Sequence, residues 1–211
     1  HAHGASINDT KAGSIGDVGS FSFFPTKLMT TGEGGMVTTN NKELAEYVKQ
    51  VRHHGQKNGL MTEMGYNWRM PQLSAILGRY QLKRLDSFIT RRNEIALKYA
   101  NAFQDIEEIE LIKVPEHITH GYWKYPILLK SKYTAKEFQT LLKEKYNIDT
   151  GTVYYPPVHL QPYYKENYGY EEGDMPSSEK NLKREICLPI FVDITDEQLN
   201  YVIESVIKEL S

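Results

Sequence analysis

Apolar side chains recur every three or four residues in three long segments of the chain. They do so from Lys42 to about His54, from Pro71 to about Phe103, and from Thr195 to Leu210. This spacing places the apolar side chains on one face of an α-helix, so each segment is predicted to be helical. In the longest segment, the pattern is also compatible with a kink or break within the helix.

Local capping signals predict further helix starts in the second half of the chain. Thr134 and Glu137 have the spacing of a capping box, which predicts a helix from there to about Lys145. A short helix is expected around residues 178–184. Gln198 completes another capping box at the start of the last helix.

Runs of alternating, branched or aromatic apolar residues predict strands between these helices. Residues 5–16 and 56–64 are polar and rich in glycine, so both are expected to be loops. The hydrophobic period changes after Asp105, which indicates a smaller α+β layer in the second part of the chain. The predicted strands are 20–24, 36–39, 109–114, 122–130 and 148–155.

One lysine stands out, because it follows an aromatic strand and precedes a glycine-rich loop. Phe21 and Phe23 alternate with serines, Pro25 ends the strand, and Lys27 comes two residues later. A solvated loop lysine is the plain alternative. Aromatic and small neighbours would instead desolvate the amine partly, which lowers its pKa and favours the neutral form. Such an amine suits a lysine that forms a Schiff base.

Composition narrows the class of protein. The 211 residues are 40% hydrophobic with a net charge of −2, so they can bury a core and show no basic stripe for nucleic acid or an anionic membrane. Cys187 is the only cysteine, which favours a reducing, cytoplasmic setting. The seven histidines form no close-spaced ligand set, so no metal site is expected. No run approaches the roughly 20 apolar residues of a membrane helix.

Four motifs together resemble the DegT/StrS family of sugar aminotransferases, which are fold-type-I enzymes that use pyridoxal phosphate (PLP). Residues 20–39, SFSFFPTKLMTTGEGGMVTT, resemble the family's cofactor-lysine segment. The other three motifs are 1–5, 65–70 and 155–162, and they occur in the family's order. The resemblance implies an α/β fold, the C-terminal part of such a transferase. In it, residues 1–90 would be part of the large PLP-binding domain and residues 91–211 the small C-terminal α+β domain.

The resemblance also implies an activity and a set of cofactor contacts. Lys27 would carry PLP as a Schiff base and move protons as general acid and base. The amino group would pass from an amino acid, glutamate in the family, to a keto sugar that is linked to a nucleotide, as in polysaccharide biosynthesis. Ser22 is placed on the PLP phosphate, and His1 beside the cofactor ring.

Three more residues receive roles from the resemblance, each with a plainer alternative. Asn67 would reach across a homodimer interface to the neighbouring subunit's PLP phosphate; otherwise it caps a helix. Arg69 would anchor substrate, or form a structural ion pair. His159 would face substrate in its proline-rich loop, although a lone histidine is more often a packing or surface residue.

The position of His1 inside a motif leads us to expect a longer polypeptide. The family's aspartate for the pyridine nitrogen would lie just upstream, in an N-terminal segment of the same protein. Residues 18–37 would belong to a larger parallel sheet. Alone, the 211 residues are expected to expose Phe21, Phe23 and Phe24 or their neighbours, to bind PLP poorly and to aggregate.

Other functions remain open at this point. A PLP-dependent sugar dehydratase of the family carries histidine in place of the lysine, so Lys27 argues against it. A cyclitol or aromatic-precursor aminotransferase of the same family uses the same cofactor chemistry. A relative without catalysis, serving as a regulatory subunit, would show no cofactor absorbance. The sequence does not identify the sugar or the nucleotide.

Overall fold

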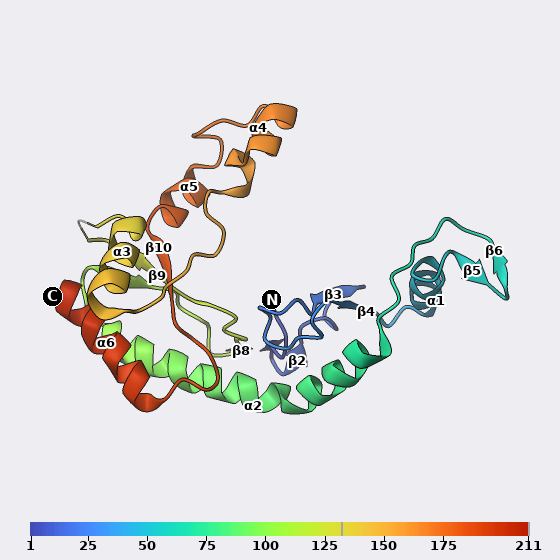
Figure 1. Cartoon of the computed structure of the whole chain (residues 1–211), viewed down its shortest axis with the longest axis horizontal. Helices are drawn as coiled ribbons and strands as arrows, with labels where there is room; N and C mark the ends of the chain where they lie inside the picture. The colour runs from blue at the N-terminus through green and yellow to red at the C-terminus, as the bar shows by residue number, and fades with distance from the viewer. Residues whose placement is uncertain (132, 211) are drawn as a thin grey trace. The chain divides into compact units, whose positions relative to one another are not determined.

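The computed structural model describes residues 1–131 and 133–210 (Figure 1). The chain divides into two compact units. Unit 1 comprises His1–Arg91 and Val114–Trp123, and unit 2 comprises Arg92–Lys113 and Lys124–Ser211. Helix α2 (Gln72–Phe103) is continuous and contributes its first part to unit 1 and its last part to unit 2 (Figure 1). The expected division into functional domains at residue 90 stays a prediction.

Unit 1 is built from short antiparallel strands and helix α1 (Lys42–Val51). The helix begins at Asn41, whose side chain accepts a hydrogen bond from the backbone N–H of Leu44. The strands pair as β2–β1–β8, β3–β4 and β5–β6. Their bounds are Ser6–Ile7 (β1), Thr10–Lys11 (β2), Gly19–Ser22 (β3), Gly35–Thr38 (β4), Gln56–Lys57 (β5), Leu60–Met61 (β6) and Ile118–Thr119 (β8).

The strands around Lys27 correct two expectations. β3 and β4 pair antiparallel, with Gly19 opposite Thr38 and Ser22 opposite Gly35, rather than as parallel strands. Phe23 is buried and only 7% exposed, whereas Phe21 is half-buried and Phe24 is 43% exposed. Phe24 is therefore exposed as expected, as are the neighbouring Met36 and Val37, whereas Phe23 is not. The polar segments 5–16 and 56–64, expected to be loops, each contain a short hairpin.

A hydrophobic cluster supports the lysine turn. Its buried members are Phe23, Leu28 and Met29 from the turn, with Leu85 and Ile89 from α2. Since Phe23 precedes Lys27 and the other two follow it directly, burial on both sides fixes the turn. Phe21, Met70 and Trp123 pack against this cluster.

Unit 2 is a small α+β layer, as the period change indicated. Its antiparallel sheet has the order β10–β9–β7, and α3 contacts both β10 and α6. Side chains that are completely buried include Tyr99, Phe138, Ile186 and Leu199. The elements are β7 (Ile109–Leu111), β9 (Tyr125–Leu129), α3 (Ala135–Tyr146), η1 (Val158–Leu160), α4 (Pro162–Tyr168), α5 (Pro176–Leu182), β10 (Glu185–Leu188) and α6 (Asp196–Leu210).

The strand expected at 148–155 does not form. Gly151 makes a single bridge with Cys187, and the ladder ends there. The next donor, the backbone N–H of Val153, instead bonds the Glu185 carboxylate at 3.0 Å. A side chain thus takes the place of a strand partner.

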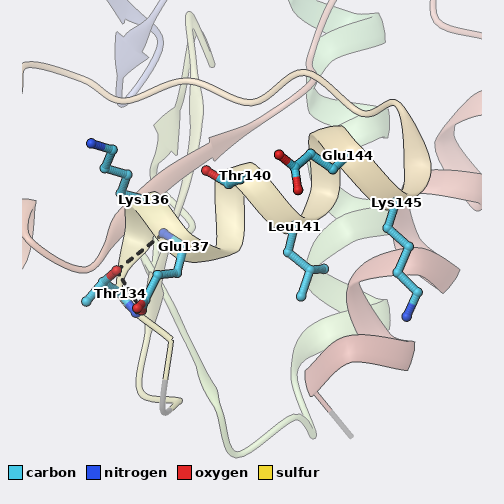
Figure 2. Close-up of a pocket in the computed structure, with 7 residues that line it drawn as sticks. All are labelled: Thr134, Lys136, Glu137, Thr140, Leu141, Glu144 and Lys145. Atoms are coloured by element: carbon cyan, nitrogen blue, oxygen red, sulfur yellow. Dashed lines mark hydrogen bonds between the residues drawn. The ribbon is translucent and has the colours of Figure 1, made fainter.

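Both predicted capping boxes are confirmed. In α3 the Thr134 hydroxyl accepts from the Glu137 backbone N–H, and the Glu137 carboxylate accepts from Thr134 (Figure 2). In α6 the backbone N–H groups and side chains of Thr195 and Gln198 pair in the same way. The residues around the hollow in Figure 2 all come from α3 and its cap, so the hollow belongs to one helix. Within the described residues, no helix has the length and apolar character to cross a bilayer.

Candidate active site

The Lys27 turn connects β3 to the glycine-rich loop. The Lys27 backbone N–H donates to the Phe24 carbonyl at 3.0 Å, which closes a turn over the proline. Phe23 holds the returning chain: its N–H donates to the Gly34 carbonyl and its carbonyl accepts from the Thr31 N–H, each at 2.9 Å. The lysine side chain is half-buried. The turn is therefore fixed by backbone bonds at both ends.

The loop after the turn closes on its own threonines. The Thr30 hydroxyl donates to the Phe23 carbonyl and accepts from the Gly32 N–H, both at 2.9 Å. Gly34 has φ +154, and a Cβ there would lie 2.4 Å from the Thr31 hydroxyl oxygen. These contacts shape the exit from the lysine turn.

Lys27 meets His1 and Trp123. The lysine Nζ lies 2.7 Å from His1 Nε2 and 4.6 Å from the centroid of the Trp123 ring. The His1 ring stacks on Trp123 with centroids 3.7 Å apart and planes 2° from parallel. The Trp123 indole N–H donates to the Thr26 carbonyl at 2.6 Å. Two side chains from distant parts of the sequence, His1 and Trp123, thus meet at the Lys27 amine.

One hydrogen bond joins the amine to the imidazole. If Lys27 is an ammonium, it donates to the lone pair of His1 Nε2, and the imidazole is neutral. If the amine is neutral, His1 Nε2–H can donate to it instead. The pair can therefore hold one proton on either nitrogen, which is the property expected of a general acid and base.

Ser22 and His3 lie beside this pair. The Ser22 side chain is exposed at the end of β3, and its hydroxyl oxygen accepts from the Phe24 N–H at 3.4 Å. His3 is 2% exposed between the rings of Phe21 and Phe23. Burial lowers the pKa of His3, against a smaller raising effect of the Ser22 backbone. In the part of the chain that the structure describes, neither nitrogen of that ring has a partner at ordinary hydrogen-bond geometry.

Asn67 and Arg69 lie on the segment that returns past the end of α1. Asn67 is exposed and forms a bridge with His53. Arg69 Nη1 lies 3.1 Å from His53 Nδ1 and 2.8 Å from His54 Nε2. The guanidinium is thus engaged by two imidazoles rather than by a carboxylate or by the first turn of α2.

His159 lies in unit 2, and its side chain faces the carboxylate of Glu179. Its Nε2 lies 3.0 Å from Glu179 Oε1, and the two side chains are 10% and 7% exposed. Glu179 also accepts from the backbone N–H groups of Gly173 and Met175. The hydrogen bond from His159 lowers the pKa of Glu179. His159 also lines a hollow of about 450 Å³ together with Tyr154, Tyr164 and Tyr170 among others.

The structure therefore brings together His1 and Lys27, with Ser22 nearby on the same strand and turn. Asn67, Arg69 and His159 are held by other contacts. Trp123 and Glu179 were not foreseen as site residues. Trp123 follows Gly121, which is buried and leaves only 3.2 Å between an added Cβ and the His3 carbonyl oxygen. Two features of the sequence could have pointed to Trp123: tryptophan is rare in this chain, and Gly121 lies two positions before it.

Comparison with known proteins gives one consistent result. The DegT/DnrJ/EryC1/StrS aminotransferase family profile matches residues 1–207. The chain is 37% identical to the spore coat polysaccharide biosynthesis protein SpsC of Bacillus subtilis, over 98% of this chain and 57% of that protein. It is 35% identical to GDP-perosamine synthase of Escherichia coli O157:H7, over 97% of this chain and 55% of that protein.

A solved structure agrees. DesV of S. venezuelae, in complex with a ketimine intermediate, superposes with a TM-score of 0.90 and 29% identity over 99% of this chain and 56% of that chain. This confirms the expected fold, the C-terminal part of a transferase of this type. The chain spans about half the length of the curated relatives it matches.

Proposed function

This chain belongs to the DegT/DnrJ/EryC1/StrS aminotransferase family, whose members depend on PLP, and we propose that the whole protein is a sugar aminotransferase. It transfers an amino group from an amino acid, with glutamate as the first candidate, to the keto group of a nucleotide-linked sugar. The Lys27–His1 contact at 2.7 Å is the observation that carries this proposal. The names of SpsC and GDP-perosamine synthase support a role in polysaccharide biosynthesis.

The residues around Lys27 fit PLP chemically. A half-buried amine on a fixed turn can hold an aldehyde cofactor covalently, and Ser22 offers an exposed hydroxyl to its phosphate. His1 presents an imidazole nitrogen next to the amine. When bound, PLP supplies an electron sink for negative charge that develops on a substrate carbon. Support for this fit comes from Lys27 on the turn, Ser22 at the end of β3, and His1 within 2.7 Å of the amine.

Lys27 is the proton carrier in this proposal. Its Nζ can take a proton and release it again, because His1 Nε2 can accept or donate along the same hydrogen bond. The buried cluster that supports the turn keeps Nζ from moving away with the loop. The lysine also argues against the dehydratase alternative, whose members carry histidine there.

Further residues complete the proposed site. Asn67 acts in trans, on the PLP phosphate of the partner subunit in a homodimer; twofold dimers are the commonest assembly. Arg69 and His159 serve the substrate, with Glu179 fixing the orientation of the His159 ring. A cytoplasmic location is proposed because Cys187, the only cysteine of the 211 residues, has no second cysteine in them for a disulfide.

The test of the proposed reaction uses the full-length protein. It is incubated with PLP, ¹⁵N-labelled glutamate and a panel of nucleotide-linked keto sugars, followed by mass analysis. One sugar should gain a ¹⁵N amino group. Lys27→Ala should abolish the transfer, and the control Lys49→Ala, which removes an exposed surface ion pair, should not. A parallel reaction replaces the sugars by cyclitol ketones and should give no labelled product. Label in a cyclitol and in no nucleotide-linked sugar would redirect the proposal to another acceptor.

A further inference from the structure

Trp123 makes three different contacts with the lysine site. Its indole N–H bonds the Thr26 carbonyl, which is the backbone group directly before Lys27. Its ring stacks on His1, and the Lys27 amine lies over it. Trp123 also packs against the buried cluster that supports the turn. One side chain thus contacts the backbone of the turn, the amine and the imidazole at once.

The stacked geometry controls where the His1 lone pair points. An imidazole nitrogen donates or accepts within the plane of its ring. With the ring held 2° from parallel to the indole, Nε2 can only be directed sideways along the indole surface. Lys27 Nζ lies in that direction at 2.7 Å. A His1 ring that rotated out of the stack would point its lone pair elsewhere.

The indole also restrains the amine. A cation over the face of tryptophan is attracted by the negative charge of the π face. The indole N–H bond to Thr26 meanwhile ties the ring to the same turn that carries the amine. A displacement of the turn would therefore move Trp123 with it and preserve the distance to Nζ.

We propose that Trp123 is the positioning residue of this site, setting the Lys27–His1 hydrogen bond. It acts through these two residues and needs no contact with substrate. Its importance for catalysis rests on the proposed function, whereas the arrangement itself is a property of the chain alone.

The first test detects the stack without any turnover. ¹⁵N-tryptophan is incorporated into the full-length protein, and the signal that disappears in Trp123→Phe identifies the indole N–H of Trp123. This signal should change position in His1→Ala, because that variant removes the imidazole ring stacked on the indole. A signal that stays unchanged in His1→Ala would show that the stack does not form, and the proposal would fall.

The second test separates positioning from general stability. Trp123→Leu should lower kcat by about tenfold or more, because a misplacement of about 1 Å can cost about 100-fold. KM for glutamate should stay within about twofold, and Trp123→Phe, which keeps an aromatic face, should recover most of the loss. Leu199→Ala is the control, because Leu199 is completely buried on α6 in unit 2; it should lower stability and leave kcat unchanged. Wild-type kcat in Trp123→Leu, or an equal loss of kcat in folded Leu199→Ala, would contradict the proposal.

The two proposals can fail separately. If PLP were attached to another lysine while the indole signal still followed His1, the proposed function would fail and the arrangement around Trp123 would stand. If PLP were attached to Lys27 and Trp123→Leu kept full kcat, only the positioning role would be lost.

Discussion

Replacing Gly4 by alanine should destabilise the protein by a predictable amount. Gly4 has φ +71, and an added Cβ would lie 2.6 Å from Cγ1 of Ile89, a side chain that is only 6% exposed. The left-handed conformation costs an alanine about 1–2 kcal/mol. Overpacking against a buried side chain adds about 1–3 kcal/mol. We therefore expect Gly4→Ala to lower the free energy of unfolding by about 2–5 kcal/mol.

A double-mutant cycle isolates the steric part of this loss. Ile89→Ala alone should cost about 2–5 kcal/mol, but it removes the atoms that the new Cβ would meet. The double mutant should therefore be more stable than the sum of the single effects predicts, by about 1–3 kcal/mol. Gly59→Ala is the matched control, because Gly59 has φ +82 and no described atom lies within 4 Å of an added Cβ. It should lose about 1–2 kcal/mol and show no coupling to Ile89.

Urea unfolding of the four cycle members and the Gly59 control, at one pH and temperature, supplies these free energies. The slopes must agree among variants for the differences to be compared. A coupling between Gly4 and Ile89 within about 0.5 kcal/mol of zero would show that the two residues do not meet as described.

Three further predictions concern the other parts of the molecule. If Asn67 acts in trans, a mixture of Lys27→Ala and Asn67→Ala subunits should recover activity that neither homodimer has. If the Asn67→Ala homodimer is impaired and the mixture recovers no activity, Asn67 does not act in trans. Because the bond from His159 lowers the pKa of Glu179, its stabilisation is present above the ordinary carboxyl pKa and disappears as pH falls through the lowered value. Glu179→Gln should therefore lower unfolding free energy more at pH 7 than at about pH 3, and equal losses at both pH values would contradict this. Thr134→Ala should cost about 0.5–2 kcal/mol in thermal or urea unfolding by breaking the capping box, and a loss no larger than that of an exposed-site control would refute the cap.

Local sequence patterns predicted the structure correctly where residues close together in the sequence determine it. The spacing of Thr134 and Glu137 predicted a cap that forms with both bonds. Helical periodicity predicted α2, although it left a break open where the helix is continuous. The alternation of serine and phenylalanine predicted β3, since one face of the strand packs on the buried cluster.

Pairing partners and distant contacts could not be predicted in this way. The segment 148–155 has the composition of a strand, yet the Glu185 carboxylate takes the hydrogen bond that a strand partner would need. The Trp123 bond to Thr26 spans 97 positions in the sequence, so no short pattern could reveal it. Likewise, Glu179 became visible as the partner of His159 only when the fold brought them within 3.0 Å.

The identity of the lysine that carries PLP is the central claim, and one measurement tests it directly. The full-length protein is loaded with PLP, reduced with borohydride and digested, and the modified peptide is identified by mass spectrometry. The account predicts phosphopyridoxyl on the peptide that contains Lys27, and its absence from every peptide of Lys27→Ala. Phosphopyridoxyl on a different lysine of the wild-type protein would contradict it.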